Sequence, residues 1–122
     1  MAEITHESIA VSEVETGILE VVHRQVHASG QDMGGSLYME RSAAAWLADQ
    51  VEGLVNGAAV GRVDATIGPD HFSVYLAGSE MQPFFNVHNR RDTSARRGQN
   101  AAIWLSEGAA RQLVTQLRAH RS

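Results

Sequence analysis

The feature that most constrains the fold of this chain is an internal repeat. When the sequence is shifted by 66 residues, residues 17–55 align with the second half without a gap. Leu37-Tyr38-Met39 falls on Ile103-Trp104-Leu105, and apolar positions agree along the whole stretch. Six positions are identical, since Val21, Arg24, Ala43, Ala44, Leu47 and Gln50 fall on Val87, Arg90, Ala109, Ala110, Leu113 and Gln116.

This repeat predicts a single compact domain made of two units, at about 3–57 and 58–121. At a shift of 67, Ser12-Glu13-Val14-Glu15 falls on Ser79-Glu80-Met81-Gln82, which extends the alignment toward the start of each unit. The hypothesis is an ancient duplication. The alternative is two similar secondary-structure units without a common origin.

Periodicity predicts strands followed by one helix in each unit. In the first unit we expect strands at about 4–11, 17–27 and 36–40, then a helix with Ser42 as its N-cap and Asn56-Gly57 at its end. In the second unit we expect strands at 60–67, 71–78, 83–91 and 100–105, and a helix over 107–120 after the N-cap Ser106. The predicted class is α+β, with the order βββα-ββββα and both helices packed on one sheet face.

Alternation along the strands of the second unit separates a core face from an outer face. The apolar stripe of the last helix should cover Phe72, Val74, Leu76, Phe85, Val87, Ile103 and Leu105. The outer face should carry Arg62, Tyr75, Phe84, His88, Arg90 and Trp104. Rings interleaved with arginines suit stacking of unpaired bases together with phosphate contacts. The first unit carries Tyr38 and Arg24 at the matching positions but also has Glu20 there. We therefore expect the first unit to bind nucleic acid less well.

The same aromatic face also fits a buried interface, either between the sheets of the two units or with a second subunit. A sheet of this size cannot cover both of its faces alone. We therefore expect a homodimer or a larger assembly.

The segment from His88 to Gln99 carries four arginines: Arg90, Arg91, Arg96 and Arg97. It lies between two predicted strands and is rich in small polar residues, so we expect a mobile loop. Because arginine can hold phosphate with two hydrogen bonds, the loop is interpreted as a phosphate-contacting arm. The alternative is a solvated hairpin loop without a partner.

Composition excludes several kinds of chemistry. The chain has no cysteine, and all ten basic residues are arginine, which excludes disulfides, thiolate metal sites and lysine chemistry. The absence of cysteine also fits a cytoplasmic location. Residues 1–60 have a net charge of −7 and residues 61–122 of +3, so only the second half can present a basic patch. No apolar run of about 18–20 residues and no signal-peptide pattern occurs, so we expect no membrane contact.

Signals for an enzyme or a metal site are weak. His23 and His27 share one face of a predicted strand, and Asp32 follows, so a His/His/Asp metal site is a candidate. No G-x-S-x-G elbow and no dinucleotide-binding loop occurs. We therefore assign no catalytic residue and no cofactor.

A tandem repeat of antiparallel strands followed by one helix resembles the Pur-alpha and Whirly families of single-strand nucleic-acid binders. The resemblance extends from about residue 4 to residue 120 and concerns topology, without a diagnostic motif. It rests on the matched Leu37-Tyr38-Met39 and Ile103-Trp104-Leu105 and on the strand Phe84-Phe85-Asn86-Val87-His88-Asn89-Arg90. It implies dimers or larger assemblies that bind single strands over curved sheets.

Two functions therefore stay open. The first is a non-enzymatic protein that binds single-stranded DNA or RNA through the aromatic and arginine face and the arginine-rich loop. The second is a small protein-interaction module, such as an inhibitor or immunity protein, that uses the same residues on an acidic partner protein.

Overall fold

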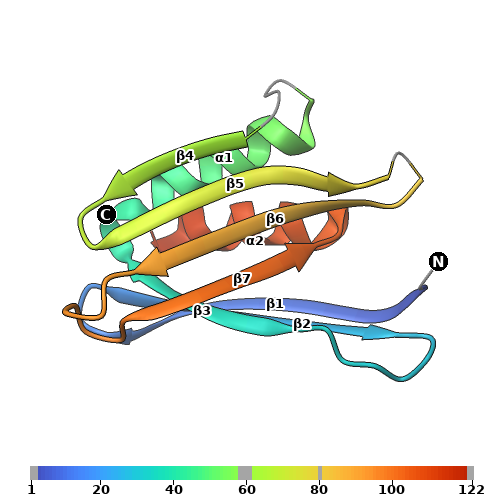
Figure 1. Ribbon diagram of the computed structural model, residues 1–122, viewed down its shortest axis with the longest axis horizontal. Helices are drawn as coiled ribbons and strands as arrows, with labels where there is room; N and C mark the ends of the chain where they lie inside the picture. The colour runs from blue at the N-terminus through green and yellow to red at the C-terminus, as the bar shows by residue number, and fades with distance from the viewer. Residues whose placement is uncertain (1–2, 58–61, 80, 121–122) are drawn as a thin grey trace.

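The computed structural model describes residues 3–57, 62–79 and 81–120, and its elements follow the order expected from the sequence (Figure 1). The first half comprises β1 (Ile4–Glu15), β2 (Ile18–His27), β3 (Gly35–Glu40), a short 3-10 helix (Arg41–Ala43) and α1 (Ala44–Val55). The second half comprises β4 (Arg62–Ile67), β5 (Asp70–Gly78), β6 (Pro83–Arg91), β7 (Gln99–Leu105) and α2 (Glu107–His120). The predicted α+β class and the order βββα-ββββα are confirmed.

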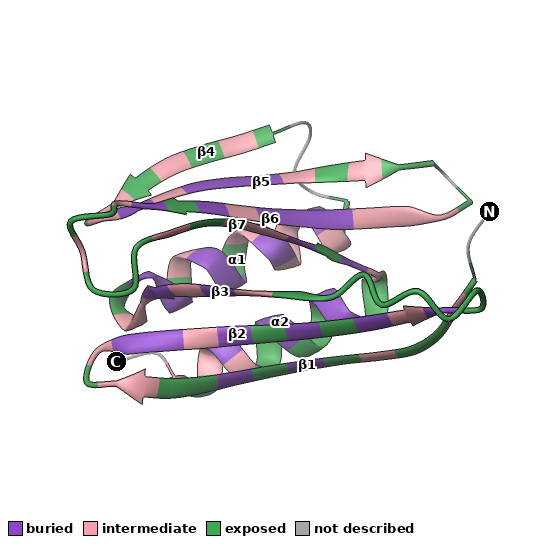
Figure 2. Ribbon diagram, turned by 60° about the horizontal axis from the view of Figure 1, so that its bottom comes forward, coloured by how far each residue is buried: buried purple, intermediate pink, exposed green. Residues whose placement is uncertain are grey.

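Two antiparallel sheets form one layer and the two helices form the other. The strand orders are β1-β2-β3 and β4-β5-β6-β7. The sheets meet where β3 lies beside β7, and both helices lie on the same side of the two sheets (Figures 1 and 2). The opposite side of the four-stranded sheet is therefore not covered by either helix.

Each helix packs mainly on strands of the other half. Helix α2 packs mainly against β1 of the first half, whereas α1 packs against β5 and β6 of the second. Trp46 of α1 contacts Phe72 of β5, with ring centroids 5.6 Å apart. The helices also pack on each other, and the buried apolar residues of both halves form one cluster. Because each helix completes the core of the other half, neither half has a separate core.

Side-chain amides join the two sheets along β3 and β7. The Gln99 side chain donates to the carbonyl of Ser36 (3.1 Å) and accepts from the backbone N–H of Tyr38 (3.0 Å). The Asn89 amide donates to the carbonyl of Tyr38 at 2.8 Å. These bonds satisfy backbone groups at the facing strand edges, which would otherwise be left without partners.

Two carboxylates occupy corresponding places at this junction. Asp70 of β5 accepts the backbone N–H of Glu40 at 2.8 Å, and Glu7 of β1 accepts the backbone N–H of Ser106 at 3.3 Å. Glu40 and Ser106 are 66 residues apart. The side chains around the carboxylates correspond at the same shift, with His23 and Gln25 around Glu7, and Asn89 and Arg91 around Asp70. Common descent of the two halves stays a prediction, which this symmetry favours.

Strand pairing corrects one part of the repeat alignment. Val11 lies opposite Val21, and Val74 lies opposite Val87. Since Val21 and Val87 correspond at a shift of 66, Val11 corresponds to Val74 at a shift of 63. At this shift Glu15, the last residue of β1, corresponds to Gly78, the last residue of β5. The predicted match of residues 12–15 with residues 79–82, at a shift of 67, is therefore wrong.

The helix caps and the core face also differ in part from expectation. Ser106 is confirmed as a cap, since its Oγ accepts the N–H of Ala109 at 3.4 Å, but Ser42 is not a cap and lies inside the 3-10 helix. Leu76 is 52% exposed, because it lies near the end of β5, where the β5–β6 hairpin extends beyond the helices (Figure 1). Val60 and Gly61, expected in a strand, lie outside the described residues.

Candidate functional site

The uncovered side of the four-stranded sheet, here called the outer face, carries its side chains in rows because the strands pair in register. We define the aromatic row as Arg62, Tyr75, Asn86 and Trp104, one residue from each strand. The next row consists of Asp64, Ser73, His88 and Ala102, and a third of Thr66, His71, Arg90 and Asn100. The outer face thus brings together six of the nine predicted site residues: Arg62, Tyr75, Phe84, His88, Arg90 and Trp104.

The two rings of the aromatic row lean toward each other. Strands β5 and β7 flank β6, which places their backbones roughly 10 Å apart. The ring centroids of Tyr75 and Trp104 are only 6.4 Å apart and meet edge to face, at 85°. The guanidinium carbon of Arg62 lies 5.5 Å from the Tyr75 centroid, a cation–π contact. Trp104 is 44% exposed, so its ring is accessible from the outer face.

Asn86 lies beneath these rings. Its Cα is paired with Tyr75 on one side and with Trp104 on the other, and the residue is only 1% exposed. Neither its amide nitrogen nor its amide oxygen has a hydrogen-bond partner. Leaving a buried amide unpaired costs about 1–3 kcal/mol. Packing alone therefore does not explain an asparagine at this position.

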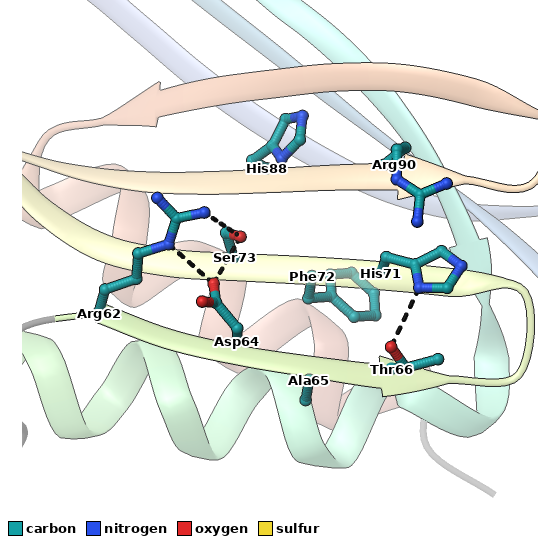
Figure 3. A pocket seen from close by; sticks show the side chains of 9 residues that line it. All are labelled: Arg62, Asp64, Ala65, Thr66, His71, Phe72, Ser73, His88 and Arg90. Atoms are coloured by element: carbon teal, nitrogen blue, oxygen red, sulfur yellow. Dashed lines mark hydrogen bonds and ion pairs between the residues drawn. The ribbon is translucent and has the colours of Figure 1, made fainter.

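The second and third rows line a shallow hollow of about 470 Å³ (Figure 3). Arg62 lies at one end of it and Arg90 at the other. The hydroxyl of Ser73 donates to Asp64 at 2.6 Å and accepts from Arg62 at 2.9 Å. Seven of the nine residues that line the hollow are polar or charged, and an arginine lies at each end, which suits a ligand that carries negative charge.

Each arginine of the outer face has a carboxylate neighbour. Arg62 bonds Asp64 at 2.8 Å, and this contact lowers the pKa of Asp64 and raises the pKa of Arg62. Arg90 lies 3.7 Å from Asp92. Both guanidinium groups are more than half exposed, so they can exchange these partners for a ligand at small cost. The outer face is therefore not strongly basic.

Two histidines are fixed in the third and second rows. His71 bonds Thr66 through Nδ1 (3.0 Å) and Asp92 through Nε2 (2.9 Å). His88 bonds the side-chain oxygen of Asn100 at 2.5 Å. These contacts orient both rings and tie β5 to β4 and to the segment after β6.

Phe84 lies one step from the aromatic row. It is paired with Ala77 of β5 and is half-buried beside Gly78, where a Cβ atom would approach the Phe84 ring to 3.2 Å. Gly78 also has a φ of +84°, a conformation that favours glycine. The absence of a side chain at Gly78 therefore leaves space for the Phe84 ring.

Arg91 does not belong to the outer face, contrary to the prediction of a phosphate contact. Its side chain is 1% exposed and bonds Asp70 at 2.8 Å and Glu40 at 2.6 Å. Burial acts to lower the pKa of this guanidinium, but the bonds to Asp70 and Glu40 outweigh burial and raise it. Strand parity explains the error, since Arg91 alternates with Arg90 and points to the core side.

Arg96 and Arg97 lie apart from the outer face as well. Both pair with Glu15 of the first half, at 3.2 and 2.6 Å, and Arg96 also donates to the carbonyl of Thr16. The Arg97 guanidinium lies 5.0 Å from the centroid of the Tyr38 ring. The expected mobile arm is thus a loop bonded to the β1–β2 turn, and its arginine charge is partly balanced there.

The predicted metal site is not assembled. His23 and His27 do share a face of β2, but both are buried, and His23 Nε2 bonds Glu7 at 2.8 Å while His27 Nε2 bonds Gln25 at 2.7 Å. Asp32 instead bonds Arg24 on the other face of β2. Within residues 3–57, 62–79 and 81–120, no group of three or more His, Cys, Asp or Glu side chains is arranged to hold a metal ion.

Sequence reasoning missed two features of the site. Parity puts Asn86 on the outer face, but nothing in the sequence indicates that two neighbouring rings bury it. The role of the partly buried Glu7 was missed because its partners His23, Gln25 and Ser106 come from distant parts of the chain. The available signal was strand parity, since Glu7 shares one face of its strand with the apolar residues Ile9 and Val11.

Comparison with known proteins found no family model that matches this chain and no curated protein with significant similarity. Among the residues that the structure describes, no helix is long and apolar enough to span a membrane.

Proposed function

We propose that this protein binds single-stranded nucleic acid, DNA or RNA, on the outer face of β4–β7 and catalyses no reaction. The observation that carries the proposal is the aromatic row. The exposed ring of Trp104 and the partly exposed ring of Tyr75 stand side by side on an uncovered antiparallel sheet, with an arginine next to them. Single-strand binders combine aromatic stacking platforms with cationic groups that follow the backbone.

In the proposed mode, bases stack on Trp104 and Tyr75, and Phe84 extends this platform toward the β5–β6 hairpin. Arg62 and Arg90 contact phosphates from the two ends of the hollow. Since the rings and the hollow lie in successive rows, a strand that crosses β4–β7 meets both. The first half takes little part, because its corresponding surface carries Glu20.

Electrostatics contribute modestly in this mode. Only Arg62 and Arg90 of the predicted arginines lie on the outer face, and each must leave a carboxylate to meet a phosphate. Two phosphate contacts correspond to a log–log salt slope of about −1.4 for single strands. Stacking, at roughly 1–3 kcal/mol per base, supplies most of the affinity.

The test is a fluorescence-anisotropy titration of labelled single-stranded and duplex oligonucleotides at 50 mM salt. Trp104→Ala should weaken single-strand binding by about 1–3 kcal/mol. Its matched control is Tyr38→Ala, the corresponding ring of the first half, which should leave binding unchanged. Failure of the wild-type protein to bind any oligonucleotide would reject the proposal.

A protein partner is the second candidate function, and a specific observation favours it. Met81, in the β5–β6 hairpin, is 84% exposed, and Leu76, near the end of β5, is 52% exposed on the side of the strand opposite to Tyr75, so the hairpin presents apolar side chains. An acidic protein that meets this hairpin, Trp104 and Arg62 would fit an inhibitor or immunity module. Loss of binding to such a partner on Met81→Ser, without any oligonucleotide binding, would support this function.

We also propose that the protein forms a homodimer. Strand β4 ends its sheet and pairs with β5 alone among the described strands. A second copy, added antiparallel with Val63 opposite Val63, would place Arg62 of each copy opposite Asp64 of the other. Light scattering that gives 13.2 kDa at every micromolar concentration would refute the dimer.

A further inference from the structure

We infer that His71 and His88 contact phosphates of the bound strand in their protonated form, so that the outer face binds nucleic acid more tightly as the pH falls. The inference rests on the proposed function, because it concerns the same hollow. Both imidazoles line the hollow that has Arg62 at one end and Arg90 at the other (Figure 3). Histidine is the side chain that ordinarily gains a charge between pH 8 and pH 5.

The charges around the hollow cancel while both histidines are neutral. Arg62 is paired with Asp64, and Arg90 lies 3.7 Å from Asp92. Two arginines therefore face two carboxylates, and a phosphate that enters the hollow meets no excess of positive charge. Each histidine that gains a proton adds one positive charge to this balance, and a phosphate supplies the negative charge that is then lacking.

The surroundings of His71 fit both the neutral and the charged ring. Its Nε2 lies 2.9 Å from the Asp92 carboxylate, and its Nδ1 lies 3.0 Å from the hydroxyl of Thr66. A hydroxyl donates to the neutral ring and accepts from the charged one, so both ring nitrogens keep a partner in both states. The like charge that faces His71 is Arg90, paired with it across β5 and β6, and Asp92 contacts both cations. The ring can therefore become charged without losing a hydrogen bond.

His88 lies one row away, on β6. Its neighbours in the row on β5 and β7 are Ser73 and Ala102, and neither carries a charge. Its Nε2 donates to the side-chain oxygen of Asn100, which can only accept, so the second proton is taken up at Nδ1. The charged groups in its own row and the two adjacent rows are Asp64, Arg62 and Arg90. Because Arg62 already bonds Asp64, the charge of a protonated His88 is available to a phosphate.

The two buried histidines of the first half have different surroundings. His23 and His27 each bond a side chain through Nε2, and Nδ1 of each is buried without a partner. A proton added at either Nδ1 would therefore be buried without an acceptor. His71 and His88 differ from them because they line a hollow of the outer face.

The test is an anisotropy titration of oligothymidylate that carries no terminal phosphate, at pH 7.5 and at pH 5.5. Neither its bases nor its phosphodiesters change charge in this range, so a pH dependence reports on the protein. The log–log salt slope should be about −1.4 at pH 7.5, as for two phosphate contacts, and about −2.8 at pH 5.5. At 50 mM salt, each protonated histidine should strengthen binding by about tenfold.

Three variants assign the effect to the two rings. His71→Gln and His88→Gln should each remove about half of the pH-dependent change in slope, and the double variant nearly all of it. His71→Arg carries its charge at every pH and should steepen the slope at pH 7.5 by about 0.7. The matched control is His6→Gln, which removes an exposed histidine from β1 and should leave the change intact. Thermal melts at both pH values verify that each variant is folded.

Equal affinities and equal slopes of the wild-type protein at the two pH values would overturn the inference and leave the proposed function standing. A pH dependence that persists in the double variant would also overturn it, because other groups would then carry the charge. Absence of binding at both pH values would reject the proposed function itself.

Discussion

The aromatic row has a counterpart in the first half, and the two rows differ in every residue. By strand pairing and the 63- and 66-residue shifts, Ser12, Glu20 and Tyr38 correspond to Tyr75, Asn86 and Trp104. The first row has one ring, covered by the Arg97 guanidinium, and a carboxylate in place of the amide. The same framework therefore presents a surface with a carboxylate in one half and an aromatic surface in the other.

The edge of β1 and the corresponding edge of β5 also have different partners. In the first half, the Gln116 amide bonds the edge of β1, accepting from the N–H of Val11 and donating to the carbonyl of Ile9, both at 2.8 Å. In the second half, β4 pairs with the corresponding edge of β5. The corresponding Gln50 makes no such bond among the described residues. The additional strand both closes an edge and supplies Arg62, Asp64 and Thr66 to the hollow.

The largest expected effect concerns the two carboxylates at the junction of the sheets, the fully buried Asp70 and the partly buried Glu7. Arg91→Leu leaves Asp70, which is fully buried, without its main charge partner and should destabilise the protein by about 3–5 kcal/mol. The corresponding Gln25→Leu leaves Glu7 bonded to His23 and Ser106 and should cost less, about 1–3 kcal/mol. Urea unfolding measures both. Equal losses would show that the two clusters are energetically alike.

A second comparison tests whether the helices are equivalent. Leu47 of α1 and Leu113 of α2 correspond at the 66-residue shift and are both fully buried. Truncation of either to alanine should cost about 2–5 kcal/mol, because each leaves a cavity in the common core. Thermal or urea unfolding that is insensitive to either substitution would contradict the shared core.

A third prediction concerns acid. Burial acts to raise the pKa of Glu7, but bonds from His23, Ser106 and Gln25 outweigh it and lower the pKa from 4.5 to about 2. The ionised carboxylate thus stabilises the fold by about 3 kcal/mol above pH 5, and this contribution disappears as the pH falls from 5 to 2. Glu7→Gln should flatten the pH dependence of unfolding in that range. Parallel curves for the variant and the wild type would contradict this role.

Much of this framework could be predicted from the sequence, because the hydrophobic pattern repeats where each element repeats. Parity along 83–91 assigned Arg90 outward correctly. The same parity assigns Arg91 to the core side, but the cluster of four arginines between residues 88 and 99 favours a flexible loop, and that expectation is wrong for Arg91. Pairing across the two halves, as of Arg97 with Glu15 or Gln99 with Tyr38, depends on how the sheets meet, and no local pattern encodes that arrangement.

The burial of Asn86 could not be predicted for a similar reason. It depends on the directions of the Tyr75 and Trp104 rings, which alternation does not determine. Alternation fixes the face of a strand residue but not the lean of its side chain toward a neighbour.

The smallest expected effect concerns charge on the outer faces of the two halves. Arg90 and Arg24 correspond at the 66-residue shift, both are exposed, and each has a nearby aspartate, Asp92 or Asp32. If binding is confined to the second half, Arg90→Gln should reduce the log–log salt slope by about 0.7, the value for one phosphate contact. Arg24→Gln should leave the slope unchanged, although it removes the same charge from the molecule. Anisotropy titrations at several salt concentrations measure both slopes. Equal reductions would mean that the strand extends over both halves or responds only to net charge, and the contrast between the two surfaces would then carry no functional meaning.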